Sequence, residues 1–97
     1  MRLHFPDGEH ADAVLSEGQT TVGSTSDNRI AINQGGVQAH HATLTLDARG
    51  LVVTVLPDGV GRTHVNGRPV RDMAIVRMGD SITFGAITAL VKPVSDK

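Results

Sequence analysis

Two arginines and a pair of adjacent histidines are the side chains with the clearest capacity for chemistry. Arg29 and Arg62 each stand in a polar stretch between apolar runs. A guanidinium binds phosphate or carboxylate through two parallel hydrogen bonds, so either arginine is a candidate anion contact, and a solvated side chain is the plain reading of both. His40 and His41 are consecutive, and consecutive side chains of an extended segment point to opposite sides. The two histidines are therefore not expected to act on one ligand.

Metal sites and catalytic sets are hard to build from the remaining residues. The chain has no cysteine, which excludes disulfides, Cys-based zinc sites and thiol catalysis. His4, His10 and His64 have no carboxylate or second histidine at a spacing typical of zinc ligands. No nucleophile has a neighbouring base and an orienting third group. We expect no metal, no cofactor and no enzymatic activity.

Composition also restricts the class of partner. The chain has 97 residues, the size of one domain, and a formal charge of −1 with scattered Lys and Arg. Phe5 and Phe84 are the only aromatic residues of the Phe, Tyr and Trp type. Neither a basic surface for duplexes nor a stacking platform for single strands is available, so nucleic acid is not expected as a ligand.

No apolar run reaches the ~20 residues that span a bilayer, and no signal-peptide core follows Met1. We expect a cytoplasmic protein without membrane attachment, one domain over residues 1–97 and a frayed tail at 93–97.

Short strands separated by turn residues are the elements that must position these side chains. No window of ten or more residues carries the helical period, whereas apolar and polar residues alternate in many short runs. Leu51–Leu56 is apolar almost throughout, which is typical of a strand covered on both faces. The pattern favours an all-β sandwich or barrel. The expected strands are Arg2–Phe5, Ala11–Leu15, Thr20–Val22, Ile30–Ile32, Thr43–Asp47, Leu51–Leu56, Thr63–Val65, Arg68–Val70, Ala74–Val76, Ser81–Phe84 and Ile87–Val91.

Two Gly-containing pairs indicate tight turns between these strands. Asn66-Gly67 predicts a two-residue hairpin turn of type I′, because both residues tolerate positive φ. Gly79-Asp80 is a second turn signal. Turn chemistry is a better explanation of Asn66 and Asp80 than catalysis or ligand binding.

The stretch THVNG followed by VRMGDSITFG resembles the C-terminal half of a forkhead-associated (FHA) domain. The resemblance extends over about Thr20 to Val91 and implies an FHA-like two-sheet antiparallel β-sandwich with short loops. It also implies a protein-interaction module in signalling, whose loops at one end of the sandwich bind a phosphothreonine peptide. The matching positions are Thr63, Val65, Asn66, Gly67, Val76, Gly79, Asp80, Ile82 and Gly85.

The resemblance is much weaker at the positions that contact phosphopeptide in the family. Where the family has Gly-Arg, this chain has Gly23-Ser24, so the arginine is absent. The family Ser-Arg-x-His is Gln38-Ala39-His40-His41 here, which keeps only the histidine. Gly61 replaces the asparagine that holds the peptide backbone in the family. The positions that shape the scaffold are kept, and those that bind the ligand are mostly changed.

We therefore expect a non-enzymatic interaction module that recognises a protein or peptide partner with weak or no dependence on phosphothreonine. The recognition loops are Ser24–Arg29, Gln34–His40 and Asp58–Thr63. Two other hypotheses stay open: a true phosphothreonine reader in which Arg62 or Arg29 replaces the missing arginine, and a self-associating domain. The candidate partner contacts are Ser24, Asn28, Arg29, Gln38, His40, Arg62 and Thr63, and the resemblance implies that Gly23, His41 and Asn66 brace the loops.

Overall fold

Short strands with one apolar face dominate the chain, as the alternating pattern predicts. The computed structural model describes residues 1–8, 10–48 and 50–93. Each expected strand is present, with ends that differ by at most two residues from the prediction. Within these ranges the elements are β1 (Arg2–His4), β2 (Ala13–Val14), β3 (Gly18–Gly23), β4 (Ile30–Ala31), β5 (Ala42–Asp47), β6 (Gly50–Val55), a 3-10 turn η1 (Pro57–Gly59), β7 (Thr63–Val65), β8 (Arg68–Pro69), β9 (Met73–Val76), β10 (Ser81–Phe84) and β11 (Ile87–Lys92).

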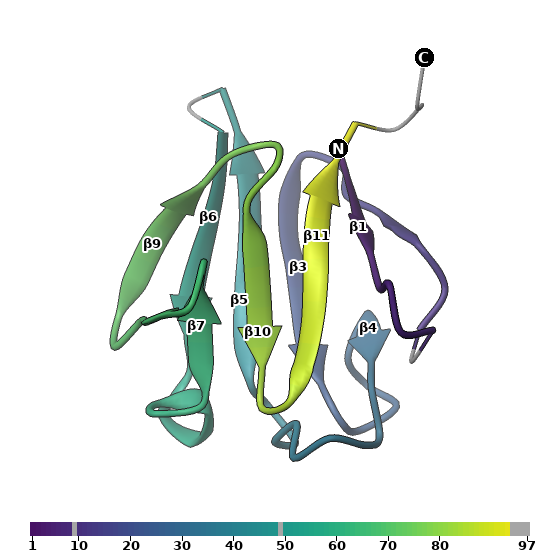
Figure 1. Cartoon of the computed structure of the whole chain (residues 1–97), viewed down its shortest axis with the longest axis vertical. Helices are drawn as coiled ribbons and strands as arrows, with labels where there is room; N and C mark the ends of the chain where they lie inside the picture. The colour runs from purple at the N-terminus through teal and green to yellow at the C-terminus, as the bar shows by residue number, and fades with distance from the viewer. Residues whose placement is uncertain (9, 49, 94–97) are drawn as a thin grey trace.

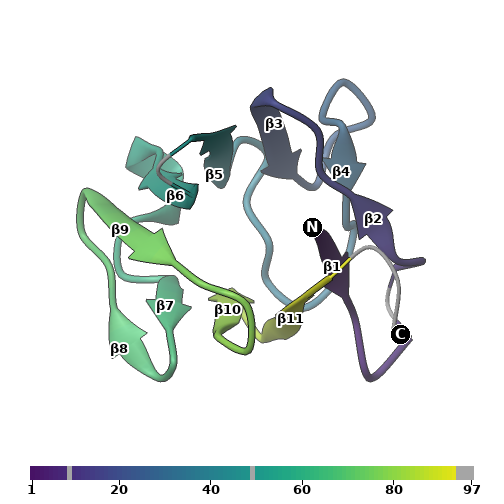
Figure 2. The ribbon, with the colours of Figure 1, turned by 90° about the horizontal axis from the view of Figure 1, so that it is seen from above.

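Two sheets face each other across the core, and Figure 2 shows them as two layers seen from above. One sheet has the strand order β2-β1-β11-β10-β7-β8 and the other β4-β3-β5-β6-β9. The predicted two-sheet sandwich is confirmed. One of the described pairs is parallel, since Val22 of β3 lies opposite Ile30 of β4. Residues 24–29 carry the chain back past the end of β3, so that β4 then runs in the same direction.

The core lies between the sheets and consists of aliphatic side chains around Phe84, which is fully buried. Leu51, Val53 and Val55 of β6 point into this core. Val52 and Thr54 lie on the outer face and are half-buried. The expectation that β6 is covered on both faces is therefore wrong, because no described element packs over the outer face of the five-stranded sheet.

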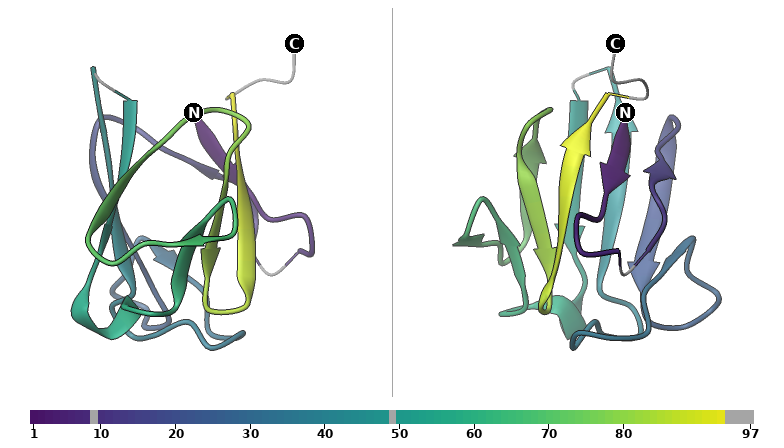
Figure 3. Two further views of the ribbon diagram at one scale, coloured as in Figure 1. Left: turned by 60° about the vertical axis from the view of Figure 1, so that its left-hand side comes forward. Right: turned by 45° about the vertical axis from the view of Figure 1, so that its right-hand side comes forward.

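The predicted type I′ turn joins β7 to β8. Asn66 has a φ of 51° and Gly67 a φ of 81°, the two positive values that this turn requires. The first and last strands lie side by side, with Leu3 of β1 opposite Val91 of β11 (Figure 3). Of the expected tail at 93–97, residues 94–97 lie outside the described part of the chain. Within the described ranges, no helix is long and apolar enough to cross a bilayer.

Candidate functional site

Three connections meet at one end of the sandwich, at the lower edge of Figure 1. They are the β3–β4 loop, the β4–β5 segment and the β6–β7 loop that contains η1. Main-chain hydrogen bonds join them to one another and to their neighbours. The Ser24 N–H donates to the Gln38 carbonyl at 2.9 Å, and the Gly85 N–H donates to the Arg62 carbonyl at 2.7 Å. The loops therefore form one connected surface, which we call the loop end.

His41 lies directly beneath the loop end and is fully buried. Its Nδ1 accepts a hydrogen bond from the Gln38 N–H at 3.0 Å. Because Nδ1 accepts, the ring proton is on Nε2, which lies 3.2 Å from the Arg62 carbonyl and donates to it. The ring meets Phe84 edge-on, with centroids 5.7 Å apart. One side chain thus links the β4–β5 segment to the β6–β7 loop.

This arrangement requires a neutral imidazole. Burial lowers the pKa of His41 below its ordinary value of 6.5, because the charged ring loses its hydration. The neighbouring Arg62 carbonyl opposes this decrease in the pKa, since it accepts a hydrogen bond from the ring. A second ring proton would sit on Nδ1 and would face the Gln38 N–H, so protonation would remove one of the two links.

Two glycines make room for the close approach of the loops. A Cβ atom on Gly23 would lie 2.0 Å from the Ala39 carbonyl oxygen and 2.5 Å from the amide nitrogen of Asn28. A Cβ atom on Gly59 would lie 2.2 Å from the His41 carbonyl oxygen. The position of Gly23 agrees with a bracing role. Gly59 was not among the sequence candidates, and its sequence signal is the Pro57-Asp58-Gly59 turn.

Two of the expected partner contacts lie inside the loops instead of on their surface. Asn28 is 7% exposed, and its amide group donates to the Thr25 hydroxyl at 2.8 Å and to the Ala39 carbonyl at 2.7 Å. Thr63 is fully buried, and its hydroxyl donates to the Gly59 carbonyl at 3.0 Å. Their polar atoms are used to fix loop conformation.

Ser24, Gln38, His40 and Arg62 remain on the surface of the loop end. Gln38 folds back, and its amide donates to the Gly36 carbonyl at 3.0 Å. The exposed His40 has its Nε2 atom 3.9 Å from Asp27. Asp27 was not foreseen as a site residue; a hydrogen bond from Thr25 is the main cause that lowers the pKa of its carboxyl group.

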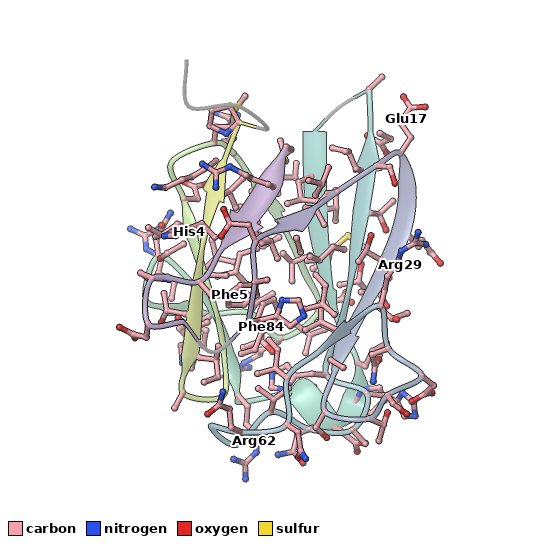
Figure 4. All side chains as sticks on the ribbon, turned by 90° about the vertical axis from the view of Figure 1, so that its right-hand side faces the viewer. His4, Phe5, Glu17, Arg29, Arg62 and Phe84 are labelled. Atoms are coloured by element: carbon pink, nitrogen blue, oxygen red, sulfur yellow. The ribbon has the colours of Figure 1, made fainter. Side chains whose placement is uncertain are left out.

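The two candidate arginines are placed differently. Figure 4 shows Arg62 projecting from the loop end, whereas Arg29 lies on the flank of the five-stranded sheet. The Arg29 N–H donates to the Thr21 hydroxyl at 3.0 Å, which holds this residue beside β3. Arg62 makes no ion pair with a described residue. Arg62 is thus the candidate arginine located at the loop end.

Asn66 is not brought together with Gly23 and His41. Its Oδ1 accepts the Ser81 N–H at 2.9 Å, which fixes the β7–β8 turn to the start of β10. Asp80 accepts the Arg77 N–H at 2.9 Å, and this hydrogen bond is the main cause that lowers its pKa. Both residues stabilise turns, as their positions beside glycine predict.

The chemistry available at the loop end is hydrogen bonding and the binding of an anion by one guanidinium. Both ring nitrogens of His41 are already engaged in hydrogen bonds with the main chain. Among the described residues, no group of three His, Cys, Asp or Glu side chains is arranged to hold a metal ion.

Comparison with known proteins identifies the family. The sequence profile of the FHA domain matches residues 20–85, which is more than half of the chain. The human kinesin-like protein KIF14 is 32% identical over 73 residues; these are 74% of this chain and 4% of that protein, so the chain spans only a small part of this relative.

Two solved FHA domains have the same architecture. The FHA-2 domain of the Mycobacterium tuberculosis ABC transporter Rv1747 is 31% identical with a TM-score of 0.67, over 84% of this chain and 73% of that one. The FHA domain of FhaA, solved in complex with the intracellular domain of Rv3910, is 25% identical with a TM-score of 0.81, over 92% and 96% of the two chains. The chain belongs to the FHA domain family, whose members are non-enzymatic interaction modules that bind phosphopeptides.

Proposed function

We propose that this FHA domain recognises a protein partner through its loop end, with weak or no dependence on phosphothreonine. The observation that carries the proposal is the chemistry at three loop positions. Ser24, Gln38 and Gly61 stand where the family has the phosphate-binding Arg, the phosphate-binding Ser and the backbone-holding Asn. Gln38 also turns its amide toward the Gly36 carbonyl, away from a ligand role.

The size of the loss supports this reading. A hydrogen bond to a charged group contributes about 1.5–3 kcal/mol, so two missing phosphate contacts remove ~3–6 kcal/mol. A micromolar complex holds only about 8 kcal/mol in total. What remains is about 2–5 kcal/mol, which corresponds to a Kd of about 0.2 mM or weaker for a phosphothreonine peptide.

A second candidate function is phosphothreonine reading with Arg62 as the replacement anchor. Two features favour it: the Arg62 side chain is exposed without an ion pair to a described residue, and its carbonyl is held by both His41 and Gly85. A guanidinium can bind phosphate through two parallel hydrogen bonds. Arg29 is the weaker substitute, because it lies on the flank of the sheet.

The test is a titration of the domain with a degenerate phosphothreonine peptide library and with its unphosphorylated counterpart. We expect no phosphate-dependent binding at low micromolar concentration. Phosphate-dependent binding that Arg62→Ala abolishes would replace the proposal with the second candidate. Phosphate-dependent binding that survives Arg62→Ala would also contradict it, and would direct attention to Arg29 and the loop amides.

A restored variant provides the matched positive control. Ser24→Arg, Gln38→Ser and Gly61→Asn together recreate the family residues. Gly61 has a φ of 80°, a left-handed conformation that asparagine tolerates well. We expect this variant to bind the phosphorylated library at least tenfold more tightly than the native domain. An unchanged affinity would mean that features other than these three residues limit phosphate binding.

A further inference from the structure

The strand β9 forms the longest free edge among the described strands. It is the last strand of the five-stranded sheet, and it has four residues, Met73–Val76. The other three edge strands, β2, β4 and β8, have two residues each. Met73 is 61% exposed and Ile75 is 65% exposed. An edge that is long and apolar is a template for pairing with another strand.

The backbone of β9 presents unpaired groups at this edge. The Val55 N–H donates to the Asp72 carbonyl at 2.7 Å, which makes this pair a hydrogen-bonded one. Hydrogen-bonded and non-bonded pairs alternate along an antiparallel ladder, and Thr54 and Val52 lie opposite Met73 and Ile75. The N–H and C=O groups of Met73 and Ile75 therefore point away from β6, toward open space.

That open space is a cavity of about 820 Å³ between β9 and the β7–β8 hairpin. Val65, Pro69 and Val70 line the side opposite β9. A smaller hollow of about 470 Å³ lies on the outer face of the sheet, beside Val52, Met73 and Ile75. Successive side chains of a strand point to opposite faces of its sheet, so a strand added to β9 would direct its side chains alternately into the cavity and into the hollow.

We propose that β9 binds an extended segment of a partner polypeptide as an added sheet strand, at a site separate from the loop end. The segment carries aliphatic residues at alternate positions, next to Met73 and Ile75. Arg68 and Arg71 line the cavity together with Asp72 and Asp80; both arginines are exposed and form no ion pair with a described residue. The segment therefore carries an Asp or Glu beside these arginines.

A second copy of this chain fits the edge less well, for two reasons. Outward-pointing residues must pair with outward-pointing residues, so β9 cannot overlap its own copy in full register. The register centred on Ala74 places Arg71 opposite Arg77 of the second copy, a repulsive pair. The register centred on Ile75 needs the Arg77 N–H, which already donates to Asp80 at 2.9 Å. These constraints do not apply to a segment of different sequence.

The experiment uses the whole chain and a defined probe. The probe is a synthetic library of unphosphorylated peptides with Val or Ile at alternate positions, random residues between them and Asp or Glu at one end. Binding is followed by amide chemical shifts and by hydrogen exchange of the Met73 and Ile75 N–H groups. We expect selected peptides to shift the β9 amides and to slow exchange at both positions, while the loop end stays unchanged.

Backbone methylation of a selected peptide gives a matched control. N-methylation at positions that face β9 should weaken binding about tenfold for each hydrogen bond lost. N-methylation at the intervening positions should leave the affinity unchanged. Ile75→Pro removes an outward N–H that the β6–β9 ladder does not use, and should abolish binding. Met73→Lys is a second variant that blocks the edge without altering the backbone.

Three outcomes would overturn the proposal. The first is a library that yields no binder preferring the native chain over Met73→Lys. The second is sensitivity to methylation at every position alike, which would indicate side-chain binding without strand addition. The third is a dimer, seen by sedimentation, that disappears in Ile75→Pro and competes with the peptide, since the occupant would then be a second copy. Arg62→Ala should leave peptide binding at β9 unaffected, which separates this site from the loop end.

Discussion

Replacing His41 by alanine is the most direct test of how the loop end is held together. The substitution leaves the Gln38 N–H without its acceptor. An unpaired buried donor costs about 1–3 kcal/mol. The Arg62 carbonyl loses one partner but keeps the Gly85 N–H at 2.7 Å, so its contribution is small. The lost edge-on contact with Phe84 adds about 0.5–1.5 kcal/mol.

The sum predicts that His41→Ala lowers the free energy of unfolding by about 1.5–4.5 kcal/mol. For a domain of this size, each kcal/mol corresponds to about 4–8 °C in Tm. Because the chain has no Trp or Tyr, unfolding in urea is best followed by far-UV circular dichroism. His40→Ala is the matched control: its side chain is 57% exposed and should be dispensable. Equal and small effects of the two substitutions would refute the bracing role.

Further measurements test the remaining reasoning. Because burial lowers the pKa of His41, native stability should be constant above about pH 6.5 and should decline as the pH falls below that value. Urea midpoints measured between pH 7 and pH 5 should show this decline. A flat profile over this range would contradict the prediction. Gly23→Ala should lower the free energy of unfolding by about 3 kcal/mol, because the added Cβ would overlap the Ala39 carbonyl oxygen. The neighbouring Ser24→Ala should leave stability almost unchanged. Equal shifts in Tm for the two variants would contradict this steric explanation. Asn66→Ala should lower the free energy of unfolding by about 1–2 kcal/mol, because alanine is strained at the positive φ of this position. Asn66→Gly should lose less stability, since glycine adopts positive φ without strain. Equal losses in the two variants would show that backbone strain is not the cause. Limited proteolysis should leave one resistant fragment, whereas two stable fragments would contradict a single domain.

The strands could be predicted from the sequence because their signals are local. The alternation in Ser81–Phe84 and the Asn66-Gly67 pair specify an exposed face, a buried face and a turn within a few residues. The parallel pairing of β4 with β3 depends on the path of the loop between them, which has no local periodic signal. Leu51–Leu56 was misleading for a similar reason, since an apolar run does not reveal whether a second layer covers it.

The candidate site was predictable in position but not in the direction of each side chain. The resemblance located the loops and His41. It could not show that Asn28 and Thr63 turn inward, because a polar residue in a loop serves a carbonyl next to it as readily as a ligand. Arg29 and Arg62 were both candidates in the sequence. The structure separates them, because the parallel pairing of β4 with β3 places Arg29 on the flank of the sheet, away from the loop end. The β9 edge was not predicted as a binding site, since its free backbone groups follow from pairing and not from residue type.

The exposed residues of the loop end take part in its internal hydrogen bonds mainly through main-chain atoms, which bond to one another or to the inward side chains of His41, Asn28 and Thr63. The main-chain atoms used in this way are the Ser24 and Gln38 amide nitrogens and the Gln38, Ala39, Gly59 and Arg62 carbonyl oxygens. A main-chain atom is present whatever the side chain is, so we expect most substitutions at Ser24, Gln38 and Arg62 to change the free energy of unfolding very little. A lineage can therefore lose phosphate recognition, drift, and acquire a different specificity without passing through unfolded intermediates. The same property makes these three positions suitable for a randomised library in which most members still fold.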